Sequence, residues 1–133
     1  MALILVIDDQ KDNQEITKRW LLRAGYQTAQ AMNGIEGVMM AQKIHPDLIL
    51  MDLSMPHMNG WAATAQIKAS PLTRHLPVIA ITALTNEGAR QQSLTAGCDD
   101  YFNKPVDFPT LLERIAVLLR GSKPDVAGAD VHW

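Results

Sequence analysis

Five short apolar runs alternate along the chain with segments in which apolar residues recur every three or four positions. The runs cover residues 2–7, 26–31, 47–51, 78–81 and 101–103. Runs of this length predict strands, and a nearly continuous one such as 2–7 predicts a strand that is buried on both faces. The second run contains Gln27, Thr28 and Gln30, so we expect it to lie at an edge of the sheet.

The segments between and after these runs predict five helices. Asp12, with Glu15 three residues on, is expected to cap the first helix, and Gly25 to end it. Its predicted apolar face consists of Ile16, Trp20 and Ala24. Asn33 and Glu36 repeat the capping pattern before a second helix, which stops at His45-Pro46. The residues predicted to face inward in this helix are Ile35, Val38, Ala41 and Ile44.

A third helix is predicted over residues 61–69, and a fourth, thinly packed one from Thr85 or Asn86 to Gly97. Asp107 is expected to cap the last helix, whose apolar face is the clearest in the chain: Leu111, Leu112, Ile115, Leu118 and Leu119. Residues 121–133 are rich in Gly, Ala, Asp and Pro, which predicts a flexible C-terminal tail. We therefore expect one domain over residues 1–120.

Strict alternation of strands and helices predicts an α/β fold, a doubly wound parallel sheet with helices on both faces. In the common flavodoxin-like strand order 2-1-3-4-5, ligands bind beyond the carboxyl ends of the strands. Polar residues stand at those ends in this sequence: Asp8 and Asp9 after the first strand, Asp52 after the third, Thr82 after the fourth and Lys104 after the fifth.

These residue types together suit phosphoryl transfer. If the first and third strands are neighbours, three carboxylates meet, and a cluster of oxygen ligands without His or Cys suits Mg²⁺. Lys104 offers a positive charge for a phosphate, and the hydroxyl of Thr82 can donate to a phosphoryl oxygen. We expect Asp52 to act as a carboxylate nucleophile that becomes an aspartyl phosphate.

Composition narrows the possible classes of protein. The chain has 133 residues, of which 47% are hydrophobic and 20% charged, and its net charge of −2 does not favour nucleic-acid binding. A single cysteine, Cys98, permits no internal disulfide and fits the cytoplasm, and no apolar run is long enough to span a membrane. The four histidines do not have the spacing of metal ligands.

Four motifs now point to one family. They are VIDD at 6–9, LILMDLSMP at 48–56, ITA at 81–83 and YFNKP at 101–105. With these motifs the chain resembles the receiver domain of bacterial two-component response regulators, from about Ala2 to Leu119. Each motif alone is weak, but four at the correct spacing are a specific signal.

The resemblance implies a role for each matching residue. Asp52 corresponds to the phosphoacceptor, Asp8 and Asp9 to the acidic Mg²⁺ site, and the backbone carbonyl of Ser54 to a further metal ligand. The other positions that match are Thr82 as the switch hydroxyl with Ala83 beside it, Lys104 as the phosphoryl-pairing lysine, Tyr101 as the switch aromatic, and Pro105 after a cis peptide bond. Ser54 and Leu84 occupy the positions that tune dephosphorylation, and neither favours a fast reaction.

The same resemblance implies partners. A histidine kinase or a phosphotransfer protein would supply the phosphoryl group, and a downstream protein would dock on the face formed by the fourth helix, fifth strand and fifth helix. We expect a stand-alone receiver, because residues 121–133 are too few to fold as an output domain. The resemblance also implies a phosphoacceptor signalling domain rather than an enzyme, one that catalyses only its own phosphorylation and slow dephosphorylation. A receiver cut from a larger regulator or hybrid kinase remains an alternative.

Three other functions fit less well. A haloacid dehalogenase-type phosphatase would need a second acid two residues after Asp52, where this chain has Ser54. A flavodoxin or nucleotide-binding protein would need a Gly- or Ser/Thr-rich phosphate loop after the first strand, where the sequence is DDQKDN. A pseudo-receiver that only binds partners would be expected to lack one of the acids or the lysine, and this chain has them all.

Overall fold

The computed structural model describes residues 1–53, 60–83, 91 and 95–121. A five-stranded sheet with the order β2-β1-β3-β4-β5 forms its centre, and every pair of neighbouring strands is parallel. The strands are β1 (Leu3–Ile7), β2 (Gln27–Ala31), β3 (Leu48–Asp52), β4 (Val78–Thr82) and β5 (Asp100–Asn103). The predicted fold class and strand order are therefore confirmed, and β2 lies at an edge as expected.

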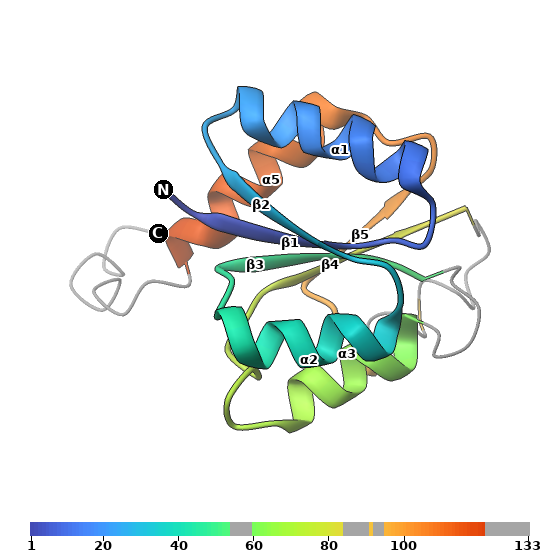
Figure 1. Ribbon diagram of the computed structural model, residues 1–133, viewed down its shortest axis with the longest axis vertical. Helices are drawn as coiled ribbons and strands as arrows, with labels where there is room; N and C mark the ends of the chain where they lie inside the picture. The colour runs from blue at the N-terminus through green and yellow to red at the C-terminus, as the bar shows by residue number, and fades with distance from the viewer. Residues whose placement is uncertain (54–59, 84–90, 92–94, 122–133) are drawn as a thin grey trace.

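Helices cover both faces of this sheet (Figure 1). α1 (Lys11–Arg23) and α5 (Phe108–Gly121) lie on one face, and α2 (Gly34–Ile44) and α3 (Gly60–Ala69) lie on the other. These are four of the five predicted helices. The predicted fourth helix lies mostly outside the described residues, as does the predicted tail from residue 122 onward.

The sheet separates two apolar cores. Between the sheet and α2 and α3 lie Leu5, Ile7, Ile49, Met51 and Ile67, among others. The core on the α1 and α5 side includes Ile4, Leu21, Leu50, Leu111 and Ile115. On that side the ring of Trp20 also stacks on Phe108, with centroids 5.2 Å apart and an interplanar angle of 6°. This contact joins α1 to the start of α5.

Hydrogen bonds also tie the opposite end of the sheet together. Nζ of Lys68, near the end of α3, donates to the carbonyl of Leu76 at 2.7 Å and pairs with Asp99 at 3.0 Å. The same Asp99 carboxylate accepts from the amide of Val78 at 2.8 Å. The amino ends of β4 and β5 are thereby fixed to α3.

Two local predictions for α1 were wrong. The helix begins at Lys11, so Asp12 lies inside its first turn, and the N-cap residue Gln10 makes no side-chain capping bond. Ile16 is 48% exposed, whereas Gln14 and Leu21 are the buried residues. The predicted apolar face was therefore rotated away from the observed one, because it was drawn through apolar residues only and the buried position at 14 is polar.

Capping was predicted better at the other helices. The Asn33 side chain accepts a hydrogen bond from the amide of Glu36 at 2.8 Å, as expected for α2, and Asp107 accepts from the amide of Thr110 at 3.4 Å at the start of α5. In α2, however, Ile35 is 53% exposed rather than inside. Among the described residues, no helix is long and apolar enough to cross a membrane.

Candidate functional site

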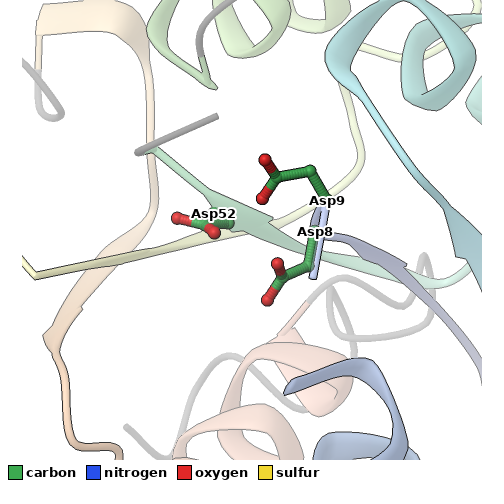
Figure 2. A group of neighbouring side chains, drawn as sticks. All are labelled: Asp8, Asp9 and Asp52. Carbon is green, nitrogen blue, oxygen red and sulfur yellow. The ribbon is translucent and has the colours of Figure 1, made fainter. Parts of the chain in front are cut away.

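Three aspartates meet at the carboxyl ends of β1 and β3 (Figure 2). Asp8 and Asp9 directly follow β1, and Asp52 is the last residue of β3. The two strands are hydrogen-bonded neighbours in which Ile7 lies opposite Met51, so the residues that follow come together. One carboxylate oxygen from each aspartate lies within 4.8 Å of the other two.

The carboxyl group of Asp8 loses its proton less readily than that of an ordinary aspartate. Burial raises the pKa of Asp8 from 3.8 to about 6, and the negative charge of Asp52 acts in the same direction. Two groups lower the pKa of Asp8 and so oppose this rise. One is the amide of Gln10, which donates to Oδ1 of Asp8 at 2.9 Å, and the other is the positive charge of the nearby Lys104. The carboxylates thus repel one another in a partly dry site, and an added cation would relieve the repulsion.

Lys104 supplies one positive charge to this cluster. Its Nζ lies 3.2 Å from Oδ2 of Asp52, whose side chain is 4% exposed. Lys104 follows β5, two strands away from β3, and its amide donates to the carbonyl of Thr82 at 2.8 Å. The peptide bond between Lys104 and Pro105 is cis.

The donor set fits a hard divalent cation. All three side chains offer carboxylate oxygens, which Mg²⁺ prefers, and among the residues that the structure describes neither His nor Cys belongs to the cluster. Among the described residues one lysine, Lys104, faces the three acids, so the cluster keeps an excess of negative charge that such an ion would balance. These residues therefore suit Mg²⁺ better than a transition metal.

The other predicted site residues lie around the aspartates. Thr82 is the fully buried last residue of β4, and Ala83 follows it. Tyr101 lies in β5 and is half-buried, and its hydroxyl accepts a hydrogen bond from Nδ2 of Asn103 at 3.2 Å. Ser54 and Leu84 lie outside the described residues, so their predicted roles remain predictions.

Sequence reasoning missed two residues next to the site. Gln14 is buried and its Nε2 donates to the carbonyl of Asp8 at 2.6 Å. Gln14 lies seven residues before the buried Leu21 on the same face of α1, but because it is polar, the apolar pattern of the sequence does not mark it as buried. Gly60 begins α3, and a Cβ there would lie 2.7 Å from the carbonyl oxygen of Asp52.

A cavity of about 480 Å³ extends from the aspartates between α1 and the start of α5. Its walls combine the site residues Asp8, Asp52 and Lys104 with apolar side chains, including Ile16 and Phe108. The partial exposure of Ile16, unexpected from the sequence, is explained by its place in this cavity wall.

Comparison with known proteins agrees with this geometry. The family model described as the response regulator receiver domain matches residues 4–116. The chain belongs to the response regulator receiver domain family. Receiver domains of this kind are signalling domains, and the predicted family is thereby confirmed.

Two response regulators illustrate the relationship. Response regulator PleD of Caulobacter vibrioides is 40% identical over 119 residues, which cover 90% of this chain and 26% of PleD. The chain therefore spans about a quarter of the length of that relative. The polar-differentiation response regulator DivK of Brucella ovis is 33% identical over 112 residues, which cover 84% of this chain and 91% of DivK.

Solved receiver structures share the fold. The receiver domain of a signal transduction histidine kinase from Syntrophus aciditrophicus superposes with a TM-score of 0.87 at 35% identity, covering 93% of this chain and 94% of that one. The receiver domain of a sensor histidine kinase from Pseudomonas aeruginosa superposes with a TM-score of 0.83 at 33% identity, covering 89% and 97%. That second structure holds a magnesium ion coordinated in its active-site cleft.

Proposed function

We propose that this receiver takes a phosphoryl group onto Asp52 with the help of Mg²⁺ and thereby changes its binding to a partner protein. The observation that supports this most directly is the contact of Lys104 with Asp52 at 3.2 Å, beside two further carboxylates. A phosphorylated Asp52 would keep the lysine as a partner for its phosphoryl oxygens, because ammonium groups bind phosphate as readily as carboxylate.

Asp8, Asp9, Asp52 and the carbonyl of Ser54 are the residues that would hold the ion. When bound, Mg²⁺ offsets the negative charge that a phosphoryl group would otherwise meet among these acids. In the transfer, an oxygen of the Asp52 carboxylate forms the new bond to phosphorus, while the bond from phosphorus to the donor breaks and its electron pair leaves with the donor. The donor we propose is a histidine kinase or a phosphotransfer protein.

Switching would use the residues beyond the acids. The hydroxyl of Thr82 and the amide of Ala83 lie at the end of β4, where they could bind phosphoryl oxygens once Asp52 is modified. Ala80 lies opposite Tyr101 in the β4–β5 register, and Thr82, two residues further along β4, faces the same side of the sheet as Ala80. Movement of Thr82 toward the phosphoryl group would therefore leave space for the side chain of Tyr101. The partner would dock on the face formed by the predicted fourth helix, β5 and α5.

Labelling with a small phosphodonor tests this proposal. Incubation with acetyl phosphate and Mg²⁺ should add the mass of one phosphoryl group to the wild-type protein and none to the Asp52→Asn variant. Asp47→Asn is a matched control, because Asp47 is exposed, lies at the other end of β3 and should leave labelling unchanged. Equal labelling of wild type and Asp52→Asn, or labelling that persists after Mg²⁺ is chelated, would refute it.

The extent of the whole protein is a separate question. The chain matches one quarter of PleD, which is compatible with a receiver that is part of a longer regulator or hybrid kinase. In that case the same labelling would occur, and a further domain would respond to the phosphorylation. A pseudo-receiver that only binds partners would give no label at all. The labelling experiment therefore separates the proposed function from this alternative.

A further inference from the structure

Gln14 has an unusual environment for a helical glutamine. Its side chain is 3% exposed, and within α1 only Leu21 is buried to a similar degree. An amide group removed from water loses several hydrogen bonds, so a buried glutamine is stable only where the protein replaces them.

The replacement partners are backbone carbonyls at the ends of two strands. Nε2 of Gln14 donates to the carbonyl of Asp8 at 2.6 Å and to the carbonyl of Ala31 at 2.8 Å. Oε1 is buried without a hydrogen-bond partner among the described residues. The reverse orientation of the amide would place Oε1 against two carbonyl oxygens, so the donors must point at the strand ends.

Further hydrogen bonds close a ring around Asp8. Its carboxylate accepts from the amide of Gln10 at 2.9 Å, and the carbonyl of Gln10 accepts from the amide of Gln14 at 3.0 Å. The amide of Asp8 donates to the carbonyl of Ala31 at 3.1 Å. The backbone of Asp8 is therefore held on both its N–H and its C=O side, and Gln14 provides the second of these contacts.

The carbonyl that Gln14 holds belongs to the peptide unit that joins Asp8 to Asp9. Because a peptide unit is planar, holding its C=O direction restricts ψ of Asp8 and φ of Asp9, and therefore restricts the directions in which the two side chains leave the backbone. Mg²⁺ demands nearly ideal octahedral geometry with oxygen distances of about 2.0–2.1 Å, so small rotations of this unit would misplace the ligands.

We propose that Gln14 is a positioning residue for the metal site: its side-chain amide holds the Asp8–Asp9 peptide in the orientation that turns both carboxylates toward Asp52. The proposal rests on the proposed Mg²⁺ site. It assigns no metal contact to Gln14 itself, which acts only through the backbone of Asp8.

Metal affinity separates this role from a merely structural one. Gln14→Met keeps the length of the side chain and removes the donors, and Gln14→Asn keeps an amide but withdraws it by one methylene. Since partners that orient metal ligands typically contribute 10- to 100-fold to affinity, we expect Gln14→Met to weaken Mg²⁺ binding about tenfold. Gln42→Met, the same change at an exposed position of α2, should leave the affinity unchanged.

The experiment is a calorimetric Mg²⁺ titration of each variant well below its melting temperature, which is measured separately in chelator. Wild-type binding with a tenfold loss in Gln14→Met, or in Gln14→Asn if the first variant does not fold, supports the proposal. A lowered melting temperature with unchanged Mg²⁺ affinity overturns it and leaves the proposed function intact. Absence of Mg²⁺ binding by the wild type overturns the proposed metal site instead, and this inference with it.

Discussion

Nζ of Lys104 lies 3.2 Å from Oδ2 of Asp52, although the two residues are 52 positions apart. Asp52 ends β3 and Lys104 follows β5, and β4 lies between these two strands. The ion pair therefore forms only when β3, β4 and β5 are assembled. It gives the buried carboxylate of Asp52 a positive partner before any phosphoryl group or metal ion arrives.

Removing that charge should both destabilise the metal-free protein and slow the labelling of Asp52. For Lys104→Met we expect the free energy of unfolding to fall by roughly 1–3 kcal/mol, because a buried carboxylate loses its partner. Labelling by acetyl phosphate should slow about tenfold, which corresponds to ~1.4 kcal/mol in the barrier. Chemical denaturation and timed mass spectrometry measure the two effects. Lys43→Met, at an exposed position of α2, is the control, and equal behaviour of the two variants would contradict this role of Lys104.

The raised pKa of Asp8 predicts how stability depends on pH without metal. Its pKa is about 6 in the folded protein against 3.8 for an unperturbed aspartate, so the folded state binds this proton more tightly. The resulting stabilisation is fully present below pH 3.8 and is lost as the pH rises through about 6. Above that pH the charged Asp8 destabilises the fold.

Asp8→Asn should therefore raise the melting temperature in chelator at pH 7.5, with a gain of roughly 3 kcal/mol in the free energy of unfolding, and give no such gain near pH 4. Asparagine can still accept the hydrogen bond from Gln10. Melting curves across this pH range test the prediction, with Asp12→Asn as the solvent-exposed control. A gain that is independent of pH would show that the effect does not come from the carboxylate charge.

Tyr101 should affect the response to phosphorylation rather than phosphorylation itself. Its hydroxyl bonds to the exposed Asn103, and its ring lies on β5 rather than among the acids. With Tyr101→Ala we expect normal labelling of Asp52. The chemical shift changes of the α5 amides on addition of a phosphoryl mimic such as beryllofluoride should be smaller, because the variant lacks the bulky side chain whose movement distinguishes the two conformations. Tyr101→Phe keeps the ring and should respond as wild type does. Full α5 shifts in the alanine variant would exclude this role.

The lifetime of the label should depend on Ser54 and Leu84. Leucine has no group that can orient a water molecule, and one good hydrogen bond to the attacking water is worth roughly 1 kcal/mol, or several-fold in rate. Leu84→Glu, alone or with Ser54→Asn, should speed loss of the label at constant Mg²⁺, followed by mass spectrometry after the phosphodonor is removed. Rapid discharge of the wild type, or unaltered decay in the variants, would show that these positions do not limit the reaction.

The parts of the fold that were predictable have strong local signals. Each strand lies within two residues of its predicted range, because continuous apolar runs such as residues 48–51 are typical of central parallel strands. The meeting of Asp8, Asp9 and Asp52 followed from the strand order alone, since parallel strands bring their carboxyl ends to one edge.

What could not be predicted depends on tertiary contacts. The burial of Gln14 follows from two carbonyls contributed by different strands, one of them 17 positions away, and no periodicity of apolar residues indicates it. The exposure of Ile35 likewise reflects how α2 packs on the sheet: at Gly37 a Cβ would collide with Cδ1 of Ile7. This close approach turns the glycine side of α2 toward the sheet and Ile35 toward solvent.

The absence of a side chain at Gly60 has a consequence for mapping the site by mutagenesis. A Cβ there would meet the carbonyl oxygen of Asp52 and the backbone of Leu53, both at 2.7 Å, so even alanine must displace the residue that carries the proposed phosphoacceptor. In a saturation scan scored by signalling output, position 60 would tolerate replacement as poorly as the acids and the lysine do, although it contributes no functional group. Sensitivity to substitution at this edge of the sheet therefore reports on available space as well as on chemistry.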